Sequence, residues 1–184
     1  MARRTLVDIE NKIIDAVIEI GSQEGINAIT SQKVAKICGV SHFTCFNYFE
    51  TRQGMLDAAA KAVEEIFLTT LNEYSHRYEH AHDIWEHILD TLLKYNKAAR
   101  YYWNYCKLYE NELEMNSLQA TRLLPYAKQL FRRSSAKNDL EFMMLWDHAL
   151  NMAFYYTDKI TRGIIANNEE TRKYISDIVF MGLH

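Results

Sequence analysis

The chain has 184 residues, of which 48% are hydrophobic and 24% charged, so it can bury a globular core and is not a disordered polyelectrolyte. The formal net charge is −3, which excludes a polycation that binds nucleic acid by overall charge but leaves room for a small basic patch. The three cysteines form no CxxC pair, and neither a signal peptide nor a run of the roughly 18 apolar residues needed for a membrane span is present, so we expect a cytoplasmic protein that does not bind membrane.

Apolar residues recur three or four apart along the whole chain, and few glycines interrupt them, which predicts an all-α protein. The first helix is predicted over residues 7–24 and ends at Gly25. Thr30 or Ser31 caps a second helix at 32–38, Gly39 stops it, Ser41 caps a third at 42–48, and Thr51 caps a fourth that continues to about residue 74. The later helices are predicted at 83–97, 98–113, 117–133 (with Pro125 as a kink or break), 138–166 and 168–182.

The stretch SQKVAKICGVSHFTCFNYFE, residues 31–50, satisfies the packing rules of a helix-turn-helix. A small residue, Ala35, stands where the two helices cross, and Gly39 can take the positive φ of the turn. The apolar positions that clamp the helices together are filled by Val34, Cys38, Val40, Cys45 and Tyr48. All of these positions fit one register, which indicates the motif; the alternative is a generic helical corner in a larger bundle.

The chain from Ile13 to Leu56 resembles the DNA-binding domain of the TetR family of bacterial transcriptional repressors, through ITSQKVAKICGVS and FNYFETRQGML and the preceding helix with Gly25. The helices predicted from the apolar pattern number about nine. An N-terminal three-helix DNA-binding domain, residues 1–50, would be joined by the fourth helix to a larger helical domain, residues 51–184, that dimerises and often holds a ligand. The implied function is sequence-specific regulation of transcription, by a repressor that a small molecule relieves.

The chain departs from the family pattern at three positions. Phe43 stands where the family usually has a small or other non-aromatic residue. Phe46 stands where the family usually has a tyrosine whose hydroxyl meets a phosphate, and Arg52 replaces the commoner lysine. Since phosphate contacts set register and affinity, we expect weaker anchoring to the DNA backbone with the docking mode retained.

The helix at 42–48 is the expected recognition helix, with its N-terminal end in the major groove. His42 can donate to a guanine edge, Phe43 can lie against a thymine methyl group, and Asn47 has the amide that pairs with adenine. Thr44, Tyr48 and Arg52 are the better candidates for phosphate contacts. At the start of the second helix, Thr30, Ser31 and Lys33 could add contacts to the DNA backbone. The predicted DNA-binding residues are Thr30, Ser31, Lys33, Ser41, His42, Phe43, Thr44, Phe46, Asn47, Tyr48 and Arg52.

One helix-turn-helix reads too few bases for a unique site, so we expect a homodimer on a palindromic operator in double-stranded DNA. The segments 138–166 and 168–182 carry more apolar residues than one intramolecular face needs, which favours them as a four-helix dimer contact. The alternative places both helices at the centre of the monomer.

Tyr, Trp and Met are dense between residues 68 and 156. Such residues suit a pocket for an apolar or aromatic effector or an aromatic cage for a cation, and they are equally typical of an ordinary core. The predicted ligand-binding residues are Tyr74, Tyr95, Tyr102, Trp103, Tyr105, Met144, Trp146 and Met152.

Other functions are weakly supported. His76, His80, His82 and His87 include a metal-ligand spacing, but solvated histidines are the simpler interpretation, so neither a metal nor a cofactor is expected. The sequence has no nucleophile elbow, phosphate-binding glycine loop or HExxH, which argues against an enzyme. The remaining alternative is a helical interaction protein with the same fold that has lost DNA binding.

Overall fold

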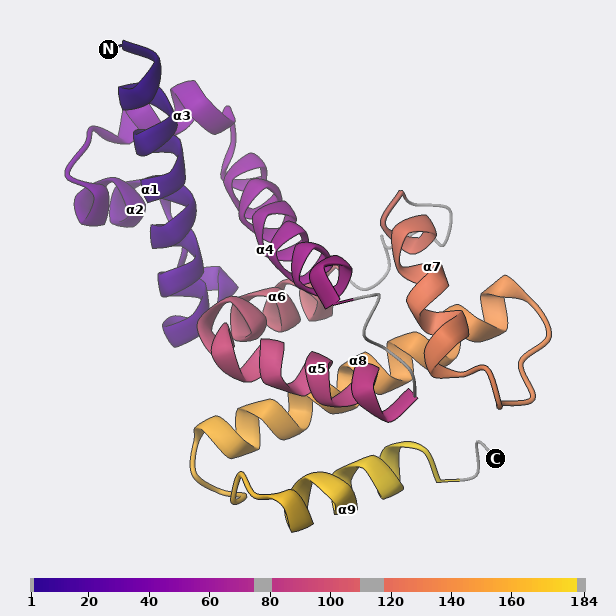
Figure 1. The fold of residues 1–184 in the computed structure, drawn as a ribbon. Helices are drawn as coiled ribbons and strands as arrows, with labels where there is room; N and C mark the ends of the chain where they lie inside the picture. Colours follow the sequence, from indigo (N-terminus) through magenta and orange to yellow (C-terminus); the bar gives the residue numbers. More distant parts are fainter. Residues whose placement is uncertain (1, 75–80, 110–117, 182–184) are drawn as a thin grey trace. The chain divides into compact units, whose positions relative to one another are not determined.

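The computed structural model describes residues 2–74, 81–109 and 118–181, and all regular structure in these ranges is helical (Figure 1). The described residues form nine α-helices and one short 3₁₀ helix, which confirms the all-α class and the expected number of helices. The elements are α1 (Ala2–Glu24), η1 (Ile26–Ala28), α2 (Ser31–Cys38), α3 (His42–Phe49), α4 (Arg52–Tyr74), α5 (Ala81–Lys94), α6 (Asn96–Leu108), α7 (Leu118–Leu130), α8 (Asp139–Thr161) and α9 (Glu169–Val179). None of the described helices is long and apolar enough to cross a lipid bilayer.

Backbone contacts divide the chain into two compact units. Unit 1 comprises residues 1–66 and 97–109, and so contains α1, η1, α2, α3, most of α4, and α6. Unit 2 comprises residues 67–96 and 110–184, and contains the end of α4 with α5, α7, α8 and α9. The sequence prediction divided the chain after residue 50 by expected function, into a DNA-binding and a ligand-binding domain. The two compact units are instead defined by contacts, and α4 contributes residues to both of them.

The two short helices of the helix-turn-helix each have a side-chain cap. The Thr30 hydroxyl accepts from the Lys33 amide at 3.2 Å, and the Ser41 hydroxyl accepts from the Thr44 amide at 3.2 Å. These caps satisfy amides at the starts of α2 and α3 that have no partner inside the helix. Between the helices, Gly39 adopts φ 70° and ψ 30°, a left-handed conformation that suits glycine because it has no Cβ.

The predicted clamp between α2 and α3 is present. Val34, Ala35 and Cys45 are buried, while the other three apolar positions of the clamp are half-buried. All three cysteines of the chain are free thiols. Burial raises the pKa of the Cys45 thiol above its usual value, which disfavours the reactive thiolate. The helix-turn-helix is therefore held by packing, and its outer side is left for other contacts.

A tight turn joins α3 to α4. Glu50 has φ 59° and ψ −44°, and it is the one non-glycine residue of the described chain with positive φ. The Thr51 amide donates to the Phe49 carbonyl across it at 2.5 Å, which is the geometry of a strained γ-turn. A Cβ at Gly54 would lie 2.1 Å from that same carbonyl oxygen, so α4 begins this close to α3 only because residue 54 is glycine. The Thr51 hydroxyl caps α4 as predicted, accepting from the Gly54 amide at 2.9 Å.

Helix α6 packs within unit 1 through a row of tyrosines. Tyr101 is fully buried, its ring touches Gly21 of α1, and its hydroxyl donates to the Leu56 carbonyl of α4 at 2.7 Å. Its ring and hydroxyl therefore join three helices of unit 1. Burial raises the pKa of Tyr101 far above the ordinary tyrosine value.

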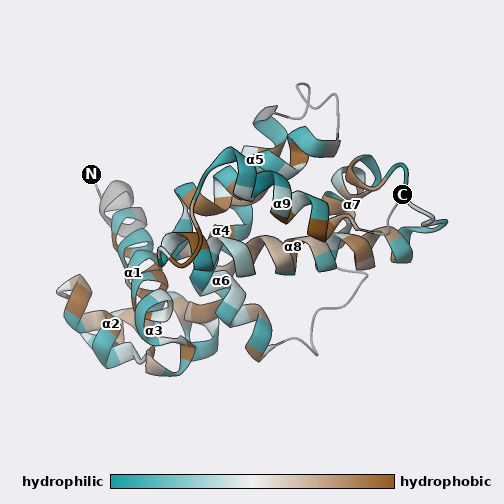
Figure 2. Cartoon of the chain, turned by 90° about the horizontal axis from the view of Figure 1, so that it is seen from below, coloured by the Kyte–Doolittle hydropathy of each residue, from teal (hydrophilic) through white to brown (hydrophobic). Residues whose placement is uncertain are grey.

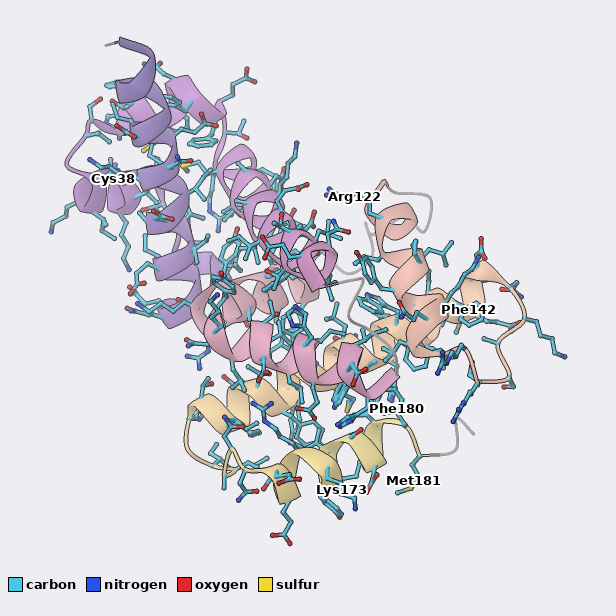
Figure 3. All side chains as sticks on the ribbon, in the orientation of Figure 1. Cys38, Arg122, Phe142, Lys173, Phe180 and Met181 are labelled. Carbon is cyan, nitrogen blue, oxygen red and sulfur yellow. The ribbon has the colours of Figure 1, made fainter. Side chains whose placement is uncertain are left out.

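Unit 2 is built from α5, α7, α8 and α9, with α8 packing against each of the other three. Trp85 of α5 and Phe131 at the end of α7 both meet Phe180, whose ring centroid lies 5.4 and 5.8 Å from theirs (Figure 3). Apolar residues run along much of α8 (Figure 2), and those that face inwards, including Trp146 and Ala153, are buried.

Helix α8 ends earlier than predicted. It stops at Thr161, not at residue 166, because Gly163 adopts φ 69° and the amide of Ile164 bonds back to the Lys159 carbonyl at 2.9 Å. This is a Schellman ending, for which Gly163 is the readable signal. Pro125 lies inside α7 and does not break the helix.

Removal of the Tyr101 hydroxyl isolates the contribution of its hydrogen bond. We expect Tyr101→Phe to lower the free energy of unfolding by about 1 kcal/mol, since one buried hydrogen bond is lost and the ring packing stays. Thr69→Val, which removes an exposed hydroxyl from α4, is the control and should leave stability unchanged. Urea unfolding at neutral pH measures both, and equal stability of the Tyr101 variant and the wild type would contradict this role.

The same pair of proteins tests the tyrosine titration. Because the pKa of Tyr101 is raised in the folded state, its stabilisation is complete below the unfolded pKa of about 10 and is lost as pH rises above it. The wild type should lose up to about 1.4 kcal/mol more per pH unit than Tyr101→Phe in that range. Parallel stability curves above about pH 10 would contradict the prediction.

Candidate nucleic-acid interface

Helix α3 presents an uncharged, largely aromatic outer face. Cys45 and Phe49 are buried and fix the helix on unit 1, whereas the side chains of His42, Phe43, Phe46, and Asn47 are exposed. Phe43 is 67% exposed and Phe46 40%, and the His42 ring lies with its centroid 4.0 Å from that of Phe43 and 6.4 Å from that of Phe46. The structure therefore gathers the predicted base-reading side chains on one side of one helix, with the His42 ring in contact with both phenylalanine rings.

Several predicted phosphate contacts already have intramolecular partners. The hydroxyls of Thr30 and Ser41 cap α2 and α3, and the Thr44 hydroxyl lies 2.9 Å from that of Ser41. Each hydroxyl can still take one further hydrogen bond, since a hydroxyl both donates and accepts. Ser31 and Tyr48 are half-buried at the same end of the motif.

Arg52 takes a different place from the one the sequence predicts. Its Nε donates to the Ile29 carbonyl and its Nη2 to the Ile26 carbonyl, each at 2.7 Å. The guanidinium therefore ties the first residue of α4 to the η1 turn before α2, and two of its three nitrogens are directed into unit 1. We assign Arg52 a positioning role through these two bonds, while the other three N–H donors of its guanidinium remain available for the predicted phosphate contact.

Positive charge is sparse at this face. Lys33 forms an ion pair with Glu24, with Nζ and carboxylate oxygen 2.5 Å apart. Lys36, in the last turn of α2, is exposed, and it forms no ion pair with another described residue. The prediction from sequence omitted Lys36, although its place on the outer side of α2 could have been read from the helical period.

The predicted ligand-binding residues fall into both compact units. Tyr102, Trp103 and Tyr105 belong to α6 in unit 1, whereas Tyr95, Met144, Trp146 and Met152 belong to unit 2. The Tyr102 hydroxyl donates to Glu64 at 2.8 Å and the Tyr105 hydroxyl to Asp57 at 2.7 Å, both on α4. The Nζ atom of Lys107 lies over the Trp103 ring, 3.7 Å from the ring centroid.

The unit 2 residues of this set differ in exposure. Trp146 is 4% exposed, Met144 is 62% exposed on the outside of α8, and Tyr95 and Met152 are half-buried. The side chain of Tyr74 lies outside the described residues.

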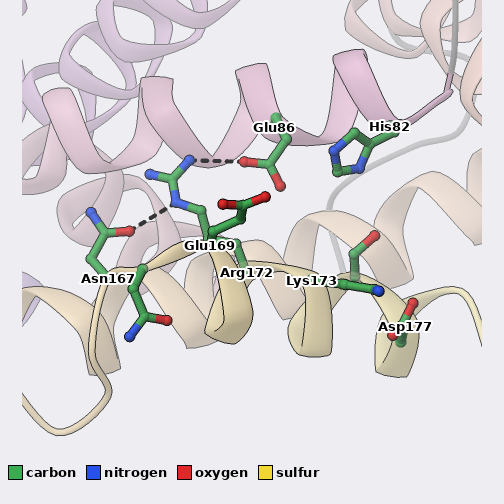
Figure 4. A pocket seen from close by; sticks show the side chains of 9 residues that line it. His82, Glu86, Asn167, Glu169, Arg172, Lys173 and Asp177 are labelled. Carbon is green, nitrogen blue, oxygen red and sulfur yellow. Dashed lines mark hydrogen bonds and ion pairs between the residues drawn. The ribbon is translucent and has the colours of Figure 1, made fainter.

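A hollow of about 730 Å³ does occur in unit 2, between α5 and α9 (Figure 4). Its lining is polar and charged, and includes His82 and Glu86 of α5 with Lys173 and Asp177 of α9. At its edge Arg172 donates to Glu86 and Asn167, each at 2.8 Å, and pairs with Asp90 at 2.8 Å. The arginine thus joins α9 to α5 through Glu86 and Asp90. No predicted ligand-binding residue lines the hollow.

The predicted histidine cluster falls only partly within the described chain. His76 and His80 lie outside it. His82 lines the polar hollow, and His87 Nε2 lies 3.1 Å from the Thr70 carbonyl. Among the described residues, no group of three or more histidine, cysteine or acidic side chains is placed to hold a metal ion.

No protein-family profile matches the chain. It is 24% identical over 118 residues to the nucleoid occlusion factor SlmA of Glaesserella parasuis serovar 5 (strain SH0165), a match that covers 61% of this chain and 58% of that protein. Among solved structures, the fold is similar to a TetR family transcription regulator from Marinobacter aquaeolei VT8, with a TM-score of 0.79, 14% identity, and coverage of 98% of this chain and 97% of that chain.

The chain has the TetR-family transcription-regulator fold. A second regulator described as TetR family, from Shewanella sp. PV-4, is similar with a TM-score of 0.61 and 16% identity over 93% of this chain and 95% of that chain. RolR in complex with resorcinol is similar with a TM-score of 0.52 and 10% identity over 98% and 90% of the two chains. The resemblance read from the motif at residues 13–56 is thereby confirmed as to fold.

A lysine at position 52 separates positioning from charge. Arg52→Lys keeps the positive charge but cannot donate to two carbonyls in the fork geometry of a guanidinium. We expect it to lower the free energy of unfolding by about 2 kcal/mol, in the range for loss of hydrogen bonds from a charged donor. Arg132→Lys, at an exposed arginine that follows α7, controls for the exchange itself. Urea unfolding makes the comparison, and wild-type stability of Arg52→Lys would show that charge alone suffices there.

Proposed function

We propose that the protein is a cytoplasmic, sequence-specific DNA-binding regulator of transcription that acts as a homodimer on a palindromic operator. The observation that carries this proposal is the outer face of α3. Its exposed side chains stand together at the position of the recognition helix in a helix-turn-helix whose caps, turn and clamp are all formed. The fold shared with solved transcription regulators supports the same function.

The chemistry of the α3 face suits base edges in the major groove. Asn47 has an amide that can both donate and accept, as an adenine edge requires, and its side chain is exposed. His42 is exposed at the first position of α3, where it can meet a guanine edge or a phosphate. Ser31, Lys33, Thr44 and Tyr48 border this face and remain in the proposal as backbone contacts, joined by Lys36.

Exposed apolar residues of α8 and α9 support the homodimer. Met144 and Tyr155 on α8 are 62% and 42% exposed, and Tyr174 and Met181 at α9 are 66% and 74% exposed. Such side chains are costly to leave in water when they follow one another along two neighbouring helices, and a second copy of the same face would cover them. Two helices from each subunit would form a four-helix contact.

The response to an effector is proposed for unit 2. Four buried polar atoms of α5 and α8 have no hydrogen-bond partner among the described residues: Trp85 Nε1, Thr91 Oγ1, Trp146 Nε1 and Thr157 Oγ1. Buried polar groups are normally satisfied, so these atoms would suit a small aromatic or apolar molecule that carries hydroxyl or carbonyl groups. The similarity to RolR, solved with resorcinol, agrees with such an effector. We propose that its binding relieves repression through α4, which runs from unit 1 into unit 2.

Selection from a random duplex library tests DNA recognition. The purified protein should enrich a palindrome at moderate salt, and a variant with His42→Ala and Asn47→Ala should fail to enrich it, because base contacts are lost from a folded domain. Leu108→Ala, which removes an exposed side chain at the end of α6, should enrich the same palindrome. Absence of enrichment by the wild type would overturn the proposal and favour the helical interaction protein that has lost DNA binding.

Sedimentation equilibrium tests the dimer. Tyr174→Glu places a charge in the proposed interface, and we expect it to raise the dimer dissociation constant at least about a hundredfold while the circular dichroism spectrum is unchanged. Leu108→Glu adds the same charge at an exposed site in unit 1 and should leave the dimer intact. A wild type that stays monomeric, or a Tyr174 variant as dimeric as the wild type, would contradict this interface.

A further inference from the structure

We propose that Phe43 and Phe46 make this protein a reader of thymine methyl groups, so that its operator contains thymine at the positions facing α3. The inference rests on the proposed DNA-binding function and adds the chemical basis of its specificity. Both phenylalanines are exposed and stand where the TetR family usually has other residues. The inference gives them a specific partner on the DNA.

The first argument is the chemistry available in the groove. Thymine carries the one apolar group, the C5 methyl, that a standard base pair presents in the major groove, whereas the other edges are hydrogen-bond donors or acceptors. Pressing a phenyl ring against a donor or acceptor removes water from it without replacing the hydrogen bond, which is unfavourable. Pressing the ring against a methyl group is favourable because both surfaces are apolar. Exposed rings therefore select thymine both by attraction and by exclusion.

The second argument is the position and order of the rings. Phe43 and Phe46 are three residues apart, so they lie about 4.5 Å apart along the helix axis, compared with about 3.4 Å between base pairs. They can thus reach the same or neighbouring base pairs. His42 contacts both rings, with centroid distances of 4.0 and 6.4 Å, so the cluster already exists before DNA binds. A pre-formed cluster loses less side-chain freedom on binding.

The third argument is the absence of charge on the reading helix itself. α3 contains no lysine or arginine, and the basic residues described beside it lie on the neighbouring helices: Lys33 and Lys36 on α2 and Arg52 on α4. Since phosphate contacts carry no sequence information, discrimination between operators falls to the uncharged side chains of α3. The methyl contacts of Phe43 and Phe46 would then carry a large share of the specificity.

Substitution of deoxyuridine for thymidine tests the inference, because it removes only the methyl group and keeps the base pair. The duplex is the palindrome enriched by the wild type, with each thymine of the half-site replaced in turn in both halves. At one or two positions we expect affinity to fall about fourfold per methyl group, or about fifteenfold for the symmetric pair. Fluorescence anisotropy at fixed salt measures the dissociation constants.

Variants link the effect to the rings. Phe43→Ala or Phe46→Ala should bind the thymine duplex more weakly and should bind the thymine and uracil duplexes equally at the position that its ring contacts. Leu108→Ala should keep the full difference. Tight binding by the wild type with no loss at any uracil, or the same loss in both phenylalanine variants, would overturn the inference and leave the DNA-binding function standing. Failure of the wild type to bind any selected duplex would overturn both.

Discussion

The guanidinium of Arg52 fixes the start of α4 against unit 1, and the proposed reading of DNA depends on this geometry. It donates to the carbonyls of Ile26 and Ile29, and so joins the start of α4 to the turn that leads into α2. On the other side, α3 reaches α4 through the γ-turn at Glu50, and the missing side chain of Gly54 lets the two helices meet. The helix-turn-helix is thus connected to α4 at both of its ends, before α2 through Arg52 and after α3 through the γ-turn. Hydrogen bonds from a charged donor to carbonyls are each worth about 1.5–3 kcal/mol, so the orientation of the outer face of α3 follows α4 closely.

Helix α4 is in turn braced by α6 within unit 1. The hydroxyls of Tyr101, Tyr102, Tyr105 and Tyr109 each donate to α4, at Leu56, Glu64, Asp57 and Gln53 respectively. These donors are spaced along one side of α6, so the two helices are joined over several turns. α4 extends unbroken from this braced region into unit 2, as far as Tyr74. In the proposed response to an effector, α4 is the element that belongs to both units, and Arg52 connects its start to the helix-turn-helix.

The sequence predicted the helix-turn-helix closely because that motif is local. Its caps at Thr30 and Ser41, its glycine turn at Gly39 and its buried Val34 and Cys45 are separated by few residues, and each can be inferred from the chain itself. The role of Arg52 could not be inferred, because its acceptors are backbone carbonyls more than twenty residues away and become neighbours only in the folded unit. Charge at that position suggested a phosphate, while the fold uses it as a tie.

The predicted aromatic pocket shows a second limit of inference from the apolar pattern of the sequence. Tyr95 and the pair Tyr102 and Tyr105 come from neighbouring predicted helices and were expected to line one pocket, yet they belong to different compact units, and the two hydroxyls of the pair are bonded to α4. Periodicity indicates which side of a helix is apolar but not which helix will cover it. The end of α8 was different, since Gly163 is visible in the sequence and signals a Schellman ending that the apolar pattern alone obscured.

Hydroxyl-radical footprinting with mass spectrometry tests most directly the claim that α3 is the DNA-binding face. The protein is oxidised alone and with saturating duplex at low salt, where binding that ignores sequence also contributes. The account predicts that oxidation of His42, Phe43 and Phe46 falls on addition of DNA, while that of Leu108, which is 50% exposed in unit 1, does not change. Unchanged oxidation of the α3 aromatics together with protection elsewhere would contradict it, and would place the DNA on another surface.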